Sequence, residues 1–486
     1  KSQMAEIINI VYDNTISFIG TMPKKLRKEY GQFFTSPHTA DFMASLFNVD
    51  LNVHSLNILD AGAGSGILGI AFVAHLRKLG YIGEIFLVCY ENDSNIIPIL
   101  EKNLLLAVEK YNITFSIKKE NYITSQKFAS EETSCIYDIV IGNPPYKKIS
   151  KDAIEAKTIP CVCYGAPNLY FLFWAMGINN LKEDGEIVYI VPRSWTSGAY
   201  FERFRAFLLQ NGVITHIHLF GSRDKVFDGD SVLQETIIVK VKKTTIKPEY
   251  VEMTYSSTSD FSDTISYSVK YDSVVGTNGY VYLVTNKDEE EVLNTLNRFD
   301  NTLVSDNLRM KTGLIVDFRT REVLRDEPSK QTYPLLYSQH IKNGRVHWPI
   351  GKEAEYIDTT RRGFLQENTN YLLVKRFTAK EEKRRLQCGI YLKDDHPDYE
   401  YISTQNKVNF IRCDTPELAY GLFALMNSTI YDIYYRILNG STQVNSTEIN
   451  NMPVPDTNTI KAMGKQLMDM ELTENNCNKV LRQWTK

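Results

Sequence analysis

The sequence predicts an α/β protein, with a seven-stranded doubly wound sheet followed by a mixed α+β domain. Short apolar runs alternate with amphipathic stretches between residues 56 and 241, a glycine-rich turn follows the first run, and the alternation stops near residue 246. The expected segments are an α/β domain over 1–245 with a helical lead-in over 1–29, a connector over 246–300, a mixed domain over 301–456 and a terminal helix over 457–486.

The expected strands are mostly apolar on both faces, as in parallel sheets that helices cover on both sides. They cover residues 56–59, 85–90, 113–117, 136–141, 186–191, 213–220 and 236–241. Helical patterns between them predict helices over 40–47, 67–78, 95–110, 170–176 and 199–210. The connector is expected because Ser, Thr, Asp and Tyr dominate between residues 255 and 272.

The composition excludes several protein classes. With 43% hydrophobic and 23% charged residues, the chain of 486 residues is typical of a globular protein. Its seven cysteines are scattered, which favours a reducing compartment over a disulfide framework, and the Cys161/Cys163 spacing does not suit zinc. We expect no metal. Apolar runs are too short to span a bilayer and no signal peptide is evident, so we expect a cytoplasmic protein without a membrane partner.

The tetrapeptide Asn143-Pro144-Pro145-Tyr146 directly follows the buried run at 136–141 and one glycine. Two prolines fix φ and remove two backbone donors, so the loop is stiff and lies at the carboxyl edge of the sheet, where ligands bind. The Asn143 side-chain carbonyl and the Pro144 carbonyl can each accept one hydrogen of an exocyclic amine, and the Tyr146 ring can stack on a planar substrate. A strand-to-helix loop that happens to carry prolines is the structural alternative.

A second candidate site follows the first strand. Asp60 precedes Ala61-Gly62-Ala63-Gly64, and glycines between a strand and a helix let a ligand approach the backbone closely. The spacing is not that of the dinucleotide fingerprint, and Asp60 suits a positive ligand group such as an amino-acid ammonium rather than a pyrophosphate. Glu91, with Asn92 beside it, ends the second strand, where a carboxylate can accept both hydroxyls of a ribose.

Two further pairs are candidates for cofactor contacts. Phe34 and Thr35 precede a helix that Thr35 or Ser36 can cap, and they either staple that helix or cover a ligand. Asn121 and Tyr122 follow the third strand, where an adenine ring needs an amide and an aromatic wall.

Basic side chains suggest a nucleic-acid partner although the net charge is −3, because binding needs only a local basic surface. Lys147 and Lys148 follow the tetrapeptide, where they can reach phosphates. The densest basic stretch covers residues 375–385, and a solvated helix with internal ion pairs is its alternative interpretation. Its candidate DNA contacts are Lys375, Arg376, Lys380 and Arg384.

Taken in this order, the motifs resemble the γ class of N6-adenine DNA methyltransferases over about residues 24–245. Residues 32–37, the Asp60 turn, Glu91 and the complete Asn143–Tyr146 motif carry the resemblance. It implies S-adenosylmethionine as cofactor, flipping of the target adenine, and stacking of that base between Tyr146 and Phe227. Asn121 departs from the family, which usually has an aspartate there. The later domain resembles the target-recognition regions of restriction–modification methylases.

The resemblance implies a site-specific DNA methyltransferase that acts on duplex DNA, either in a restriction–modification system or as an orphan methylase. Such an enzyme is expected to be associated with the nucleoid in a prokaryotic cytosol. A cognate restriction endonuclease is a candidate partner, and no obligate protein partner is evident. The alternatives are an RNA or protein-glutamine methyltransferase that uses the same pocket, and a DNA specificity subunit without catalysis.

Overall fold

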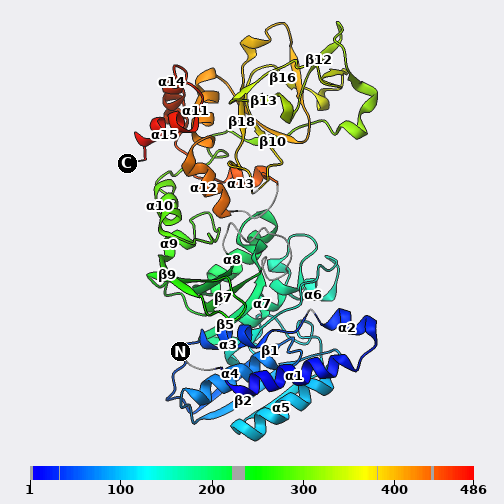
Figure 1. Cartoon of the computed structure of the whole chain (residues 1–486), viewed down its shortest axis with the longest axis vertical. Coiled ribbons are helices and arrows are strands. Elements are labelled where there is room, and N and C mark those ends of the chain that lie inside the picture. The colour runs from blue at the N-terminus through cyan, green and yellow to red at the C-terminus, as the bar shows by residue number, and fades with distance from the viewer. Residues whose placement is uncertain (1–3, 32, 222–235, 380, 439–442, 486) are drawn as a thin grey trace. The chain divides into compact units, whose positions relative to one another are not determined.

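A computed structural model describes residues 4–31, 33–221, 236–379, 381–438 and 443–485. The chain divides into two compact units, Lys1–Thr285 and Asn286–Lys486. Figure 1 shows that both units mix helices and strands. Within the described residues, no helix combines the length and the hydrophobicity needed to cross a membrane.

Unit 1 is built on one nine-stranded sheet, in the order β3-β2-β1-β4-β5-β7-β6-β8-β9. All seven expected strands are present, which confirms the predicted fold class. The strands are β1 (Ser55–Ala61), β2 (Glu84–Tyr90), β3 (Thr114–Lys118), β4 (Tyr137–Gly142), β5 (Leu181–Pro192), β6 (Val213–Phe220), β7 (Thr236–Lys242), β8 (Tyr250–Ser256) and β9 (Ile265–Lys270).

The strand order reverses between β1 and β4, which lie side by side although β2 and β3 separate them in the chain. The first five strands run parallel, whereas β7 is antiparallel to both β5 and β6. In open α/β sheets, ligands bind outside the carboxyl ends of the strands at such a reversal. The loops after β1 and β4 are therefore the expected place for a site.

Helices cover both faces of this sheet. One face packs in a hydrophobic core with α1, α3, α4 and α5, and the other contacts α7, where Trp174 packs against Tyr189 of β5. The helices of unit 1 are α1 (Glu6–Gly20), α2 (Lys24–Tyr30), α3 (Pro37–Ser45), α4 (Ile67–Lys78), α5 (Ile97–Tyr111), α6 (Ile154–Thr158), α7 (Leu169–Asn180), α8 (Glu202–Asn211) and α9 (Tyr271–Val274), with short 3₁₀ turns η1 (Pro160–Val162), η2 (Arg193–Thr196) and η3 (Ala199–Phe201).

The stretch expected to be a connector, 246–300, is divided between the units. Strand β8 pairs in parallel with β6, and β9 then pairs with β8, so both extend the large sheet. The polar residues that suggested a connector occupy the edge, where one face of a strand meets water. Helix α10 (Lys287–Leu296) already belongs to unit 2.

Unit 2 contains a six-stranded sheet, β10-β20-β17-β18-β14-β13, and a five-stranded sheet, β11-β15-β12-β19-β16. Most of the neighbouring strands pair antiparallel. The strands are β10 (Met310–Thr312), β11 (Leu324–Arg325), β12 (Thr332–Leu336), β13 (Ile341–Lys342), β14 (Arg345–Val346), β15 (Tyr356–Asp358), β16 (Gln366–Glu367), β17 (Asn370–Lys375), β18 (Cys388–Tyr391), β19 (Tyr401–Thr404) and β20 (Val408–Cys413).

Apart from α10, the α-helices described in unit 2 follow its last strand in the chain, and α11 packs on α14 and α15. The single helix expected over 457–486 is instead two helices, because Thr473 caps a new one through a bond from the Asn476 N–H. The bounds are α11 (Pro416–Met426), α12 (Thr429–Leu438), α13 (Ser446–Asn450), α14 (Thr457–Leu467) and α15 (Glu474–Arg482), with 3₁₀ turns η4 (Asp317–Arg319), η5 (Arg321–Val323), η6 (Ser338–His340), η7 (Arg362–Phe364) and η8 (Lys393–Asp395).

Candidate active site

The tetrapeptide leaves β4 at the point where the strand order reverses. Asn143 is half-buried, Pro144 is buried and Pro145 is exposed. The Asn143 amide is held from two sides: its Nδ2 donates to Thr35 Oγ1 at 3.2 Å, and its Oδ1 lies 3.2 Å from Tyr146 Oη. Thr35 comes from the turn before α3, so two segments far apart in sequence fix one amide.

Tyr146 leaves the Asn143 oxygen able to accept a second hydrogen. Its phenol has one proton, and Oη also lies 3.0 Å from the Ile190 carbonyl. When that proton goes to Ile190, Asn143 Oδ1 is free to accept from a ligand. Burial raises the pKa of Tyr146 well above its ordinary value, so the group stays neutral. The ring packs edge-on against Tyr170, with 6.1 Å between centroids.

The glycine turn after β1 lies against this loop. Gly62 and Gly64 have φ of +67° and +56°, which side chains rarely tolerate. A Cβ on Gly62 would lie 3.4 Å from the Phe173 ring and 3.8 Å from Pro145 Cδ, whereas one on Gly64 would lie 3.6 Å from Phe34. The turn is therefore a cradle with aromatic walls, and it adjoins the tetrapeptide.

The two acidic residues near this turn differ in their surroundings. Asp60 is 1% exposed, beside the buried Ala61, and accepts a bond from the Gly69 N–H of α4 at 3.2 Å. Burial raises the pKa of Asp60 well above its ordinary value. Asp60 is thus buried and bonded to the helix that follows the turn, which corrects the expectation that it meets a ligand's ammonium directly.

Glu91 is placed as the sequence predicted, at the end of β2. Its Oε1 accepts from the Gly64 N–H at 2.9 Å and its Oε2 from the Asp93 N–H at 3.1 Å. Each carboxylate oxygen has a second lone pair, so Glu91 can hold the glycine turn and accept a hydroxyl at the same time. Asn92 is exposed beside it.

Asn121 and Tyr122 are more enclosed than expected. Asn121 Oδ1 accepts from the Thr124 N–H at 3.1 Å, and its Nδ2 donates to Glu155 at 3.1 Å. Tyr122 is 3% exposed and bonds through its hydroxyl to Asn180. Tyr122 is therefore a core residue, which corrects its prediction as a ligand wall. Phe173 is half-buried and would lie 3.4 Å from a Cβ on Gly62, so its ring borders the glycine turn.

Sequence reasoning missed Phe173 and Glu155. Phe173 lies in α7, a helix that is apolar and aromatic along most of its length. Its sequence gives no sign of which ring lies near Gly62, and only the folded structure shows this. Glu155 follows the tetrapeptide lysines in α6, and no pattern predicts its contact with Asn121.

The predicted DNA contacts separate into three groups. Lys147 and Lys148 are exposed beside the tetrapeptide, and Lys148 Nζ lies 5.8 Å from the Tyr200 ring centroid. In unit 2, Lys375 ends β17, and Arg376 Nη1 donates to the Asn406 carbonyl at 3.0 Å. Lys380 lies outside the described residues, as does Phe227, which was expected to stack on the flipped base.

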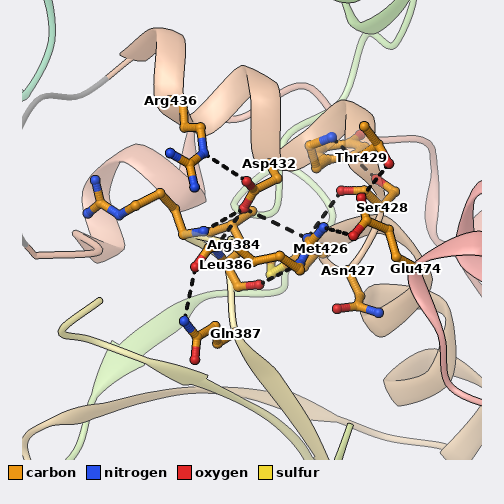
Figure 2. A network of polar contacts seen from close by, with 12 residues as sticks. Arg384, Leu386, Gln387, Met426, Asn427, Ser428, Thr429, Asp432, Arg436 and Glu474 are labelled. Atoms are coloured by element: carbon orange, nitrogen blue, oxygen red, sulfur yellow. Dashed lines mark hydrogen bonds and ion pairs between the residues drawn. The ribbon is translucent and has the colours of Figure 1, made fainter. Parts of the chain in front are cut away.

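Arg384 is held within unit 2. Its Nη2 donates to the carbonyls of Met426 and Ser428 at 2.8 and 3.2 Å, and its guanidinium pairs with Glu474 at 3.3 Å. Figure 2 shows these partners around one side chain, with Asp432 next to them. These contacts correct the prediction of Arg384 as a phosphate contact.

Comparisons with known proteins identify the family of the chain. The family model "Eco57I restriction-modification methylase" matches residues 78–227. The chain is 35% identical over 462 residues to type II methyltransferase M.BsuBI of Bacillus subtilis, covering 92% of this chain and 91% of that protein. It is 33% identical to type II methyltransferase M.PstI of Providencia stuartii, covering 99% and 98%.

A shorter match is with a release factor glutamine methyltransferase of Fusobacterium nucleatum. It is 36% identical over 103 residues, which cover 21% of this chain and 25% of that protein. With 92% and 99% of this chain covered, the matches to the two type II methyltransferases extend into unit 2.

Proposed function

Because the chain belongs to the type II DNA methyltransferases of restriction–modification systems, we propose that it methylates N6 of an adenine flipped out of duplex DNA. The observation that carries this proposal is the Asn143 amide, whose oxygen lies at the switch point of the sheet beside a glycine cradle. An amide oxygen there can accept one hydrogen of an exocyclic amine, as adenine N6 offers.

The residues at the turn fit S-adenosylmethionine. Gly62 and Gly64 present open backbone between Phe34 and Phe173, and Glu91 keeps acceptor capacity for ribose hydroxyls. When bound, this cofactor supplies a methyl group that its sulfonium already activates. The protein's own task is then to position the amine and to shape its lone pair.

Asn143 and the Pro144 carbonyl perform that task in our proposal. Two acceptors on the amine hydrogens favour a pyramidal nitrogen, whose electron density points toward the incoming methyl group. This is electrostatic preorganisation combined with in-line positioning. No strong base is needed, because the amine proton becomes acidic once the new N–C bond forms. Extrusion of the base costs roughly a few kcal/mol, which stacking on Tyr146 partly offsets.

A glutamine methyltransferase is the second candidate, because a side-chain amide presents the same NH₂ group and the short match supports it. Type II relatives that match nearly the whole chain favour DNA. The test is incubation with duplex DNA and labelled cofactor, followed by nucleoside mass spectrometry. N6-methyladenine is expected; N4-methylcytosine, or label only in protein or RNA, would refute the proposal.

The pH dependence of cofactor binding provides a prediction for Glu91. Burial raises the pKa of Glu91 above its ordinary value, so it protonates at a higher pH than an exposed glutamate. Ribose hydroxyls donate to the ionised form, so cofactor affinity should fall as the pH drops through this raised pKa. Calorimetry over a pH series should show that Glu91→Gln binds more weakly and without this dependence; an unchanged pH profile in the variant would contradict it.

Substitutions at Tyr146 separate stacking from packing. Tyr146→Ala should lower kcat roughly 5- to 150-fold, the value of one lost base stack, with a smaller loss of duplex affinity. Tyr146→Phe keeps the ring and removes only the hydroxyl that contacts Asn143, so it should lose less activity than Tyr146→Ala. Single-turnover methylation and anisotropy with duplex DNA measure both quantities. Equal losses of turnover and affinity in Tyr146→Ala would indicate a packing role alone.

A further inference from the structure

We propose that the turn Gln405–Lys407, between β19 and β20, is the centre of a surface of unit 2 that reads DNA sequence, with Asn406 contacting a base edge. This inference rests on the proposed function and extends it to sequence selection. None of these three residues belongs to the site described above.

Two distant segments of the chain converge on this turn. From the segment after β10, the Ile315 carbonyl accepts the Asn406 N–H at 2.8 Å, and Asp317 accepts from Gln405 Nε2 at 3.3 Å. From the end of β17, the Arg376 N–H donates to the Lys407 carbonyl at 3.0 Å. These hydrogen bonds connect positions 315–317, 376 and 405–407 into one cluster. Ile315 and Gln405 are its buried members, whereas Arg376 and Asn406 are half-buried and Lys407 is exposed.

The turn itself is rigid. Gln405 is 2% exposed, and its side chain accepts from the Lys407 N–H at 2.9 Å and donates to Asn406 Oδ1 at 3.1 Å. Its own N–H donates to the Leu336 carbonyl at 2.9 Å. Asn406, half-buried, thus has its amide oriented by a buried neighbour, whereas Lys407 is exposed. An oriented amide is the group that pairs with the N6 and N7 edge of adenine in the major groove.

Exposed aromatic rings flank the turn, each with an arginine beside it. Phe318 is 65% exposed and Phe377 is 45% exposed. The guanidinium carbons of Arg319 and Arg376 lie 5.3 and 5.2 Å from the centroids of these rings. Each ring therefore presents an exposed apolar face beside a cation.

The chemistry of this surface selects duplex DNA among possible occupants. Lys407, Arg319 and Arg376 supply positive charge, whereas the Asp317 carboxylate accepts a bond from Gln405. Cations position a protein on phosphates, a side-chain amide reads a base edge, and aromatic side chains fit between or against bases. A protein partner could also pack against the two rings, but the excess of cations specifically favours a partner that carries phosphates.

The test compares Asn406→Ala and Lys407→Ala with the unaltered full chain. Methylation-sensitive sequencing of DNA from expressing cells first gives the methylated site, and fluorescence anisotropy then measures binding to a duplex with that site and to a scrambled duplex at several salt concentrations. Lys330→Ala is the matched control, because Lys330 is exposed before β12, at the opposite end of that strand from Leu336.

Asn406→Ala should weaken binding to the cognate duplex roughly 5- to 150-fold and leave binding to the scrambled duplex unchanged. Lys407→Ala should weaken both equally and lower the slope of log K against log[salt] by about 1. Both residues act through side chains at the surface, so thermal melting should stay at the wild-type temperature.

An unchanged cognate-to-scrambled ratio in Asn406→Ala, with Lys407→Ala behaving like Lys330→Ala, would overturn this inference while the proposed function stands. If the unaltered chain neither methylates nor binds duplex DNA, the proposed function and this inference fail together.

Discussion

Asn143→Ala is expected to lower kcat for methyl transfer by at least roughly 10²–10³-fold, the cost of removing one preorganised polar group from a transition state. The variant loses the amide that Thr35 and Tyr146 hold in place, and with it one of the two acceptors for the amine. The glycine cradle does not depend on this side chain, so cofactor affinity should remain close to wild type. A tritium-transfer assay and calorimetry measure the two quantities.

Thr35→Val is the companion variant, because it removes the acceptor of Asn143 Nδ2 but keeps the catalytic amide and the side-chain shape. Its kcat should fall between those of the wild type and Asn143→Ala, since the amide is present but less well oriented. Full activity in Asn143→Ala would refute the mechanism. A parallel loss of cofactor affinity and turnover would show instead that Asn143 holds the cradle.

The sequence predicts where the two loops of this candidate site lie, because their signals are local. A buried strand, one glycine and two prolines determine the shape of the loop that carries Asn143, and a strand followed by spaced glycines determines the cradle. Parallel strands that end at one edge of the sheet then bring the two loops together. Neither motif alone predicts that the loops adjoin. The contact from Thr35 to Asn143 links residues 108 positions apart and becomes evident only in the folded chain.

Predictions failed where burial decides the role of a residue. Asp60 and Tyr122 carry the right chemistry at the right places in the chain, but one supports α4 and the other packs against Asn180. A sequence gives the type and order of side chains. Whether the Asp60 carboxylate faces a ligand or the interior depends on how α4 packs after the turn. The same limit applies to β8 and β9, whose polar edge residues resemble a connector.

The basic stretch at 375–385 shows that a sequence does not distinguish paired cations from exposed ones. Arg376 lies at the surface described above, whereas Arg384 pairs with Glu474, 90 residues later in the chain. Nothing in a run of cations distinguishes a residue with a distant carboxylate partner from one that faces solvent. Asp432 is that kind of distant partner, and it fixes the path of this stretch.

Asp432→Ala is expected to lower the unfolding free energy of unit 2 by about 3–5 kcal/mol, the cost of removing one partner from a buried ionic network. Asp432 is 6% exposed; its Oδ1 accepts the N–H groups of Arg385 and Leu386 at 2.9 Å each, and its Oδ2 accepts from Arg436 Nε at 3.0 Å. Figure 2 shows this carboxylate between helix α12 and the basic stretch. Chemical denaturation, monitored by hydrogen exchange of amides in unit 2, measures the loss of unfolding free energy.

Two variants give this prediction its controls. Asp432→Asn keeps an oxygen for the two backbone N–H groups but loses the charge, so its loss should be smaller than that of Asp432→Ala. Arg412→Gln breaks an ion pair with Glu367 whose side chains are 53% and 59% exposed, and it should change stability by less than about 1 kcal/mol. Equal losses in Asp432→Ala and Arg412→Gln would mean that the network does not hold the basic stretch. A selective loss would show that one buried carboxylate, far away in sequence, anchors it.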